Sequence, residues 1–142
     1  MDAVPALGYL LKSAQAQLHS RMDEALRPLG LGVSQYVALH LMHEQHGISA
    51  AELARRAFVT RQSMSALVQG LVDRGLVERS GRPGERALST SVTGIGRDVL
   101  RRAVLVVDGV ESRMLSGLSA DDRQSLGDAL ATCIANLGAP SP

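Results

Sequence analysis

The stretch GLVERSGRPGERALSTSVT, which runs from Gly75 to Thr93, decides how this sequence folds. It predicts two short strands on either side of a tight turn, because Gly81, Pro83 and Gly84 are typical turn residues. Arginines stand at the tip and at the base of this predicted hairpin. The chain on either side has the apolar spacing of helices. The sequence therefore predicts one isolated hairpin in a mainly helical protein.

Two helices are predicted in the first third of the chain. Apolar side chains recur at helical spacing over residues 6–27, and Pro28 with Gly30 closes this segment. Ser34 is the predicted N-cap of a second helix, which extends to about Glu44.

Two further helices lead into the hairpin. Ser49 and Glu52 have the spacing of a capping box and predict a short third helix. Thr60 is the predicted cap of a fourth helix over residues 61–74. One continuous apolar stripe predicts which face of this fourth helix is buried: Met64, Leu67, Val68, Leu71 and Val72.

The other face of the fourth helix is polar and carries no acidic residue before Asp73. A short helix, a tight turn and such a helix match the helix-turn-helix description, whose second helix lies in the major groove of DNA. The hairpin is then interpreted as a wing that brings arginines to phosphates or to a narrow minor groove. The predicted DNA contacts are Thr60, Arg61, Gln62, Ser63, Ser65 and Gln69 on the helix and Arg79, Arg82 and Arg86 on the wing.

The positive charge of the chain is concentrated in the same segment. The whole chain of 142 residues has a formal net charge of only +1. Between Arg55 and Arg86, however, seven arginines stand against three acidic residues, a local excess of four positive charges. A basic patch of this kind is typical of a surface that binds nucleic acid.

Helices follow the hairpin as well. Thr93 is the predicted cap of a long helix that ends near Leu115, and Ser119 with Asp122 predicts the start of a last helix. An apolar stripe runs along this last helix: Leu126, Leu130, Cys133, Ile134 and Leu137. This stripe and the one over residues 6–27 need a partner surface, which favours a homodimer over the alternative, a helix bundle formed within one chain.

From Leu29 to Gly96 the chain resembles the MarR family of winged helix-turn-helix transcriptional regulators. The matching pieces are ISAAELARR (48–56), SMSALVQGLVDRGLVER (63–79) and RALSTSVTGIG (86–96). The resemblance implies a mainly α winged helix-turn-helix fold. It also implies that residues 33–93 form the DNA-binding lobe and that residues 1–32 and 94–142 form the dimerisation helices.

The resemblance has further implications for the site. Ser63 and Ser65 stand where the family has two small hydroxyl residues on the recognition helix. Three features depart from the family pattern: the wing is about one residue shorter than usual, Glu85 replaces an Asp of the wing, and Ala66 stands where the family often has Arg. The resemblance implies a homodimer that binds a near-palindromic operator in double-stranded DNA, with recognition helices about 34–36 Å apart.

A small aromatic or lipophilic effector that releases a repressor is likewise implied by the resemblance. Its pocket is expected between the first, second and fifth helices, with four candidate lining residues: His19, Met22, Tyr36 and His40. For each of these residues, an ordinary core or surface role is the competing interpretation.

Metal and redox chemistry are the less favoured alternatives. His40, His43 and His46 are closely spaced, but no cysteine or second histidine pair completes a metal site, so no metal and no cofactor are predicted. Cys133 is the single cysteine and falls on an apolar stripe, which favours a core or interface thiol over a sensor. The lack of a disulfide framework and of a signal-like N-terminus leads us to expect a cytoplasmic protein.

No catalytic constellation is found in the sequence. The serines do not occur in a G-x-S-x-G pattern, and Gly94 and Gly96 do not make a dinucleotide fingerprint, so we do not expect an enzyme. A winged-helix module that binds proteins without touching DNA is the main alternative function. The acid-free helix face beside an arginine-rich hairpin favours DNA.

Overall fold

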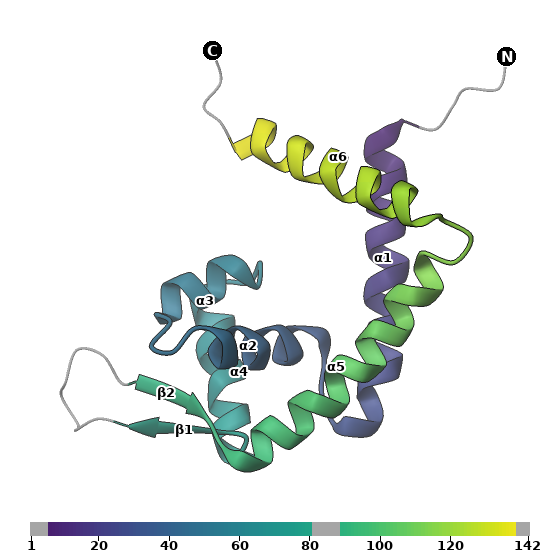
Figure 1. Cartoon of the computed structure of the whole chain (residues 1–142). Helices are drawn as coiled ribbons and strands as arrows, with labels where there is room; N and C mark the ends of the chain where they lie inside the picture. Colours follow the sequence, from purple (N-terminus) through teal and green to yellow (C-terminus); the bar gives the residue numbers. More distant parts are fainter. Residues whose placement is uncertain (1–5, 81–88, 139–142) are drawn as a thin grey trace, which may run out of the picture. The chain divides into compact units, whose positions relative to one another are not determined.

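The computed structural model describes residues 6–80 and 89–138 (Figure 1). The chain divides into two compact units, Met1–Val110 and Glu111–Pro142, and each is described by itself. The predicted fold class, mainly helical with a small β-wing, is confirmed. The elements in chain order are α1 (Leu7–Leu26), the 3-10 turn η1 (Arg27–Leu29), α2 (Val33–Glu44), α3 (Ala50–Arg56), α4 (Arg61–Asp73), β1 (Val77–Ser80), β2 (Ser89–Val92), α5 (Gly94–Met114) and α6 (Ala120–Gly138).

The helix α1 continues directly into η1, and the pair ends as the sequence predicts. Pro28 lies at the start of η1, where its missing N–H ends the α-helical hydrogen-bond ladder of α1. Gly30 follows with a φ of 70°, the left-handed conformation that favours glycine at a helix end. The predicted helix boundary at Pro28 and Gly30 is therefore confirmed.

The start of α2 differs from the prediction. Ser34 lies inside the helix, and Gly32 occupies the N-cap position. The free backbone donors of the first turn find other acceptors: the N–H of Val33 donates to Oδ1 of Asp23, and the N–H of Gly32 donates to Oε1 of Gln35, both at 3.0 Å. The prediction that Ser34 caps this helix is wrong, because a carboxylate from α1 performs that function.

The predicted caps of α3 and α4 are confirmed. The hydroxyl of Ser49 accepts a hydrogen bond from the N–H of Glu52 at 3.1 Å, and the hydroxyl of Thr60 accepts one from the N–H of Ser63 at 3.0 Å. Each bond satisfies a donor that the helix itself leaves free. The two helices pack against each other and form the helix-turn-helix of the first unit.

The strands β1 and β2 form an antiparallel pair, in which Val77 lies opposite Val92 and Ser80 lies opposite Ser89. This pairing confirms the predicted hairpin. Its turn falls within residues 81–88, outside the described residues. On the protein side, β1 packs on α4 and β2 packs on α2. The sheet therefore contacts α4, the predicted recognition helix, through β1 and contacts α2 through β2.

The start of α5 is joined closely to the base of the hairpin. The hydroxyl of Thr93 accepts from the N–H of Gly96 at 3.0 Å and donates to the carbonyl oxygen of Gly75 at 2.6 Å. A Cβ at Gly96 would overlap the carbonyl oxygen of Leu76, so only glycine allows this close approach. Thr93 therefore caps α5, as predicted, and also fixes the hairpin to it.

The core of the first unit is aliphatic. Its buried side chains come from both ends of the unit, including Leu26 of α1 and Leu100 of α5. Burial of one such side chain stabilises a fold by about 1.5–3 kcal/mol. The largest fully buried side chains are Leu26, Leu39, Met42, Met64, Leu71 and Val77.

The second unit contains the last residues of α5 and the helix α6. The hydroxyl of Ser119 accepts from the N–H of Asp122 at 3.1 Å, and Oδ2 of Asp122 accepts from the N–H of Ser119 at 3.3 Å. This reciprocal pair is the capping box that the sequence predicts. No residue of α6 is buried within the second unit. In the described ranges, no helix is long and apolar enough to span a lipid bilayer.

Candidate nucleic-acid interface

The helix α4 has one buried face and one exposed face. Met64, Val68 and Leu71 are buried in the core of the first unit, as the stripe predicts. The opposite face therefore points to solvent, and it carries no carboxylate before Asp73. All the candidate DNA-contacting residues of this region are exposed: Thr60, Arg61, Gln62, Ser63, Ser65 and Gln69.

The exposed residues at the start of α4 fall into two groups. Thr60 and Ser63 are engaged with each other, because the Thr60 hydroxyl donates to Oγ of Ser63 at 2.9 Å in addition to its capping bond. The side chains of Arg61, Gln62 and Ser65, in contrast, meet no hydrogen-bond partner within the described part of the chain. These three side chains keep their donors and acceptors available for a ligand.

Gln69 of α4 and Arg79 of β1, both candidate DNA contacts, form a hydrogen bond with each other. Nη1 of Arg79 donates to Oε1 of Gln69 at 2.7 Å, and Nε2 of Gln69 donates to Oδ1 of Asp73 at 2.8 Å. The Gln69 amide therefore links the strand that leads to the wing with the end of the recognition helix. Sequence reasoning missed this link, because a spacing along the chain does not reveal which polar groups meet across two elements.

The arginines of the basic segment have different surroundings. Arg55 donates from Nε to Oε2 of Glu52 at 3.1 Å, and this hydrogen bond lowers the pKa of Glu52 and raises the pKa of Arg55. Arg74 donates to backbone carbonyls of the α1–α2 junction. Arg82 and Arg86 lie outside the described residues. Among the described arginines of this segment, Arg61 is thus the one on the α4 face with an uncommitted charge.

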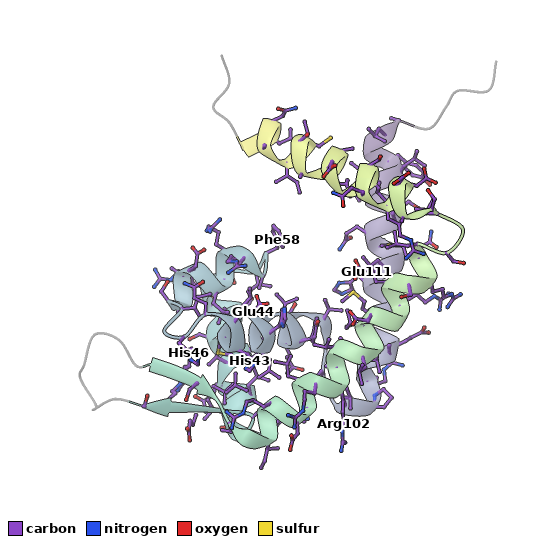
Figure 2. All side chains as sticks on the ribbon, viewed as in Figure 1. His43, Glu44, His46, Phe58, Arg102 and Glu111 are labelled. Atoms are coloured by element: carbon purple, nitrogen blue, oxygen red, sulfur yellow. The ribbon has the colours of Figure 1, made fainter. Side chains whose placement is uncertain are left out.

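Phe58 is a residue that the sequence analysis did not single out. It lies at the turn between α3 and α4 with a φ of 58°, and it is 95% exposed (Figure 2). Its N–H donates to the carbonyl of Arg55 at 3.3 Å, which closes the end of α3. The left-handed conformation at this point normally requires glycine, and helix-turn-helix turns often contain one. The absence of a glycine from the turn between the two predicted helices was therefore the signal in the sequence that could have identified Phe58.

The candidate effector residues lie on α1 and α2. Tyr36 and His40 are brought together: their rings are stacked with centroids 5.9 Å apart. Nε2 of His40 faces Glu44 at 3.3 Å, while Nδ1 is buried and meets no hydrogen-bond partner among the described residues. His19 is exposed and pairs with Asp23 at 3.3 Å, and Met22 packs partly buried against the core. The structure thus joins two of the four candidates directly.

The histidines at the end of α2 and the cysteine of α6 were the candidate metal and redox sites. His43 and His46 are exposed at the C-terminal end of α2 (Figure 2). Within residues 6–80 and 89–138, no group of three His, Cys, Asp or Glu residues is arranged to hold a metal ion. Cys133 is half-buried on the apolar stripe of α6.

Comparison with known proteins places this arrangement in a family. The model of the MarR family matches residues 29–87, which contain the complete helix-turn-helix and β1. The HTH-type transcriptional repressor Rv2887 of Mycobacterium tuberculosis (strain ATCC 25618 / H37Rv) is 38% identical over 119 residues, 83% of this chain and 86% of the relative. The chain belongs to the MarR family. It is therefore a DNA-binding transcription regulator, and the family resemblance of its sequence is confirmed.

Solved structures of MarR-family proteins share the fold along nearly the whole chain. The crystal structure of Rv2887 in complex with DNA has a TM-score of 0.75 and 36% identity, and covers 97% of this chain and 100% of that one. The crystal structure of Rv2887 with p-aminosalicylic acid has a TM-score of 0.77 and 36% identity, with 89% and 97% of the two chains covered. The likeness thus includes the helices outside the helix-turn-helix.

Proposed function

We propose that this MarR-family protein is a repressor that binds a near-palindromic operator as a homodimer and is released by a small aromatic acid. The observation that carries the DNA-binding part is the exposed face of α4. Arg61, Gln62 and Ser65 project from its first two turns with no partner among the described residues and no acid beside them. Side chains of these types read donors and acceptors on base edges in the major groove.

The remaining candidate residues have supporting roles in this proposal. Thr60 and Ser63 hold the first turn of α4 in place, which leaves their hydroxyls for phosphate oxygens at most. Gln69 fixes Arg79, so that the Arg79 guanidinium is held at a defined place on β1 for a phosphate contact. Arg82 and Arg86, in the segment between the strands, supply further positive charge for the DNA backbone.

The exposed apolar residues support the assignment of DNA binding and dimerisation to different parts of the chain. Residues 33–93 bind DNA, and residues 1–32 and 94–142 carry the dimer contacts. On α1, Leu7 and Tyr9 are 66% and 67% exposed, and on α6, Ile134 and Leu137 are 71% and 88% exposed. Exposed apolar side chains of this kind, which their own unit does not cover, would be covered in a dimer interface.

An aromatic acid is the proposed effector class. Crystals of Rv2887 have been obtained with p-aminosalicylic acid and with salicylic acid. In this chain, the stacked Tyr36 and His40 offer an aromatic surface, and the buried Nδ1 of His40 lacks a partner among the described residues. A buried polar atom without a hydrogen bond is costly, so a carboxylate or hydroxyl that reached it would gain binding energy.

The test is a mobility shift of the DNA upstream of this protein's own gene, with and without salicylic acid. We expect the protein to retard this DNA and salicylic acid to raise the dissociation constant by about 5- to 150-fold, the usual range of allosteric coupling. His40→Ala should reduce that response, whereas His43→Ala, a matched change at an exposed histidine of the same helix, should preserve it. If neither this DNA nor any duplex selected from random sequences is bound, the alternative of a protein-interaction module is favoured instead.

A further inference from the structure

Arg74 connects the end of the recognition helix to the end of the first helix. It is the C-cap residue of α4, and Gly75 turns the chain away immediately after it. Nη1 of Arg74 donates to the carbonyl oxygen of Gly30 at 2.6 Å, and Nη2 donates to the carbonyl oxygen of Leu29 at 3.1 Å. These acceptors lie 44 and 45 residues earlier in the sequence, at the end of η1. The contact is therefore between distant parts of one unit.

The partners suit each other electrostatically. The last carbonyls of a helix have no intrahelical donor, and the C-terminal end of the helix carries about half a negative charge. The planar guanidinium of Arg74 offers two parallel N–H groups that match two adjacent carbonyl oxygens. A lysine would bring the same charge but no fork of this shape. Arg74 thus caps, from another helix, the C-terminal end of the continuous α1–η1 helix.

Gly30 is fitted to the same contact. Its φ of 70° already favours glycine, and a Cβ there would lie 2.8 Å from Nη2 of Arg74 and 3.2 Å from Cζ. The guanidinium therefore lies directly on the backbone of Gly30. Because the end of the Arg74 side chain is flexible, a larger residue at position 30 would push the guanidinium away from its present place on the two carbonyls.

We propose that Arg74 is a positioning residue that sets the orientation of the recognition helix relative to α1, and through α1 relative to the dimer. This inference rests on the proposed function. If α1 carries dimer contacts, the distance between two recognition helices depends on how each α4 is held against its own α1. The contact through Arg74 joins the two helices directly, whereas the packing route passes through α2. In this role the Arg74 guanidinium affects the distance between the two recognition helices of the dimer and does not contact DNA.

The test compares Arg74→Ala with Arg102→Ala on two kinds of DNA. Arg102 is an exposed arginine of α5 (Figure 2) and is not one of the exposed apolar side chains to which the dimer contacts are assigned, so this control removes the same charge at another site. The duplexes are an operator selected from random DNA, variants with one base pair inserted or removed between the half-sites, and a single half-site. Circular dichroism and sedimentation check that each variant folds and dimerises as the wild type does.

For Arg74→Ala we expect the affinity for the full operator to fall about tenfold, a typical coupling between residues of one network, while half-site affinity changes less than about twofold. The preference for the correct spacing should weaken as well. Arg102→Ala should change neither spacing preference nor the ratio of full-site to half-site affinity. An equal loss on full and half sites would mean that Arg74 contacts phosphate, and that result, or no loss at all, overturns the inference.

Two further variants keep the test decisive if Arg74→Ala does not fold. Arg74→Lys keeps the charge but can satisfy fewer carbonyls, so it should show part of the spacing defect. Gly30→Ala keeps Arg74 but crowds its guanidinium, and should show the same spacing defect beside the loss of stability that an L-residue brings at a φ of 70°. In the double variant that combines Gly30→Ala with Arg74→Lys, the two spacing defects should not add. Additive defects overturn the inference, whereas failure of the wild type to bind any duplex overturns the proposed function with it.

Discussion

The helices α4 and α6 are both amphipathic, yet they use their apolar faces in opposite ways. Met64 and Leu71 of α4 are completely buried within the first unit. On α6 no residue is buried, and Ile134 and Leu137 are 71% and 88% exposed. The apolar face of α4 is satisfied within the chain, and what it offers to a ligand is polar. What α6 offers is apolar, which fits a second protein surface.

The energetic consequence differs for the two regions. Complete burial of a leucine or isoleucine side chain is worth about 1.5–3 kcal/mol, and α4 obtains this within the chain. The exposed residues of α6 obtain little of it until another surface covers them. The stability of the first unit should therefore depend on its own core, and that of α6 on protein concentration.

The largest effect is expected from a charge placed on the apolar face of α6. Ile134→Glu should prevent dimerisation at micromolar concentration, because a carboxylate cannot be buried in an apolar interface without a large desolvation cost. Sedimentation should then show a species near the 15.0 kDa mass of one chain. Operator affinity should fall by more than about a hundredfold, since each half-site is bound separately.

Ala135→Glu is the matched control for this prediction. It introduces the same carboxylate at the next residue of α6, which lies about 100° around the helix and away from the stripe. We expect this variant to remain dimeric and to bind DNA normally. A wild-type protein that sediments as a single chain would refute the dimer contacts and the two-half-site operator together.

An intermediate effect is expected from residues that offer polar groups to DNA. Gln62→Ala should cost about 1–3 kcal/mol on the operator and leave the affinity for random DNA nearly unchanged, as expected for a base contact. Arg82→Ala should weaken binding to operator and random DNA alike. It should also reduce the slope of the logarithm of the binding constant against the logarithm of the salt concentration by about one, as expected for a phosphate contact. Fluorescence anisotropy over a range of salt concentrations measures both.

Each outcome of this pair has a definite interpretation. A uniform loss for Gln62→Ala would reassign that side chain to the DNA backbone. If both variants bind every duplex as tightly as the wild type, the exposed face of α4 serves a protein partner and the DNA-contact proposal fails. Both variants should dimerise normally, because neither residue lies on a terminal helix.

The sequence predicts best those features that depend on neighbouring residues. The caps at Ser49, Thr60 and Thr93 each involve a residue three positions along the chain, and all are confirmed. The Ser34 cap was predicted by the same reasoning and is wrong, because Asp23 supplies an acceptor from another helix. Local patterns cannot anticipate a competitor that folding brings from elsewhere.

The same limit applies to the candidate site. Exposure of the α4 face follows from the apolar stripe on its other side, so the sequence could predict it. The bonds that Gln69 makes to Arg79, and that Arg74 makes to the η1 carbonyls, join distant segments. Nothing in a single sequence indicates that these side chains are already engaged. An arginine-rich segment can therefore overstate the charge that is available to DNA.

The smallest effect is expected at Phe58, in the turn that precedes α4. An L-residue in the left-handed conformation costs about 1–2 kcal/mol, and the ring of Phe58 recovers little of this because it is 95% exposed. Glycine removes that strain but makes the unfolded chain more flexible, which costs roughly 0.4–1 kcal/mol. Phe58→Gly should therefore stabilise the protein by about 0.5–1 kcal/mol, the difference between these two effects.

Phe58→Ala separates the strain from the loss of the ring. Alanine also lacks the ring but keeps a Cβ, and with it the strain of the left-handed conformation. Phe58→Gly should therefore be more stable than Phe58→Ala, the reverse of the order at an ordinary helical position. Denaturant titrations at one fixed protein concentration give both values, since dimerisation makes stability depend on concentration. If alanine proves as stable as glycine, the turn relaxes out of the left-handed region without cost, and Phe58 stores no strain next to the recognition helix.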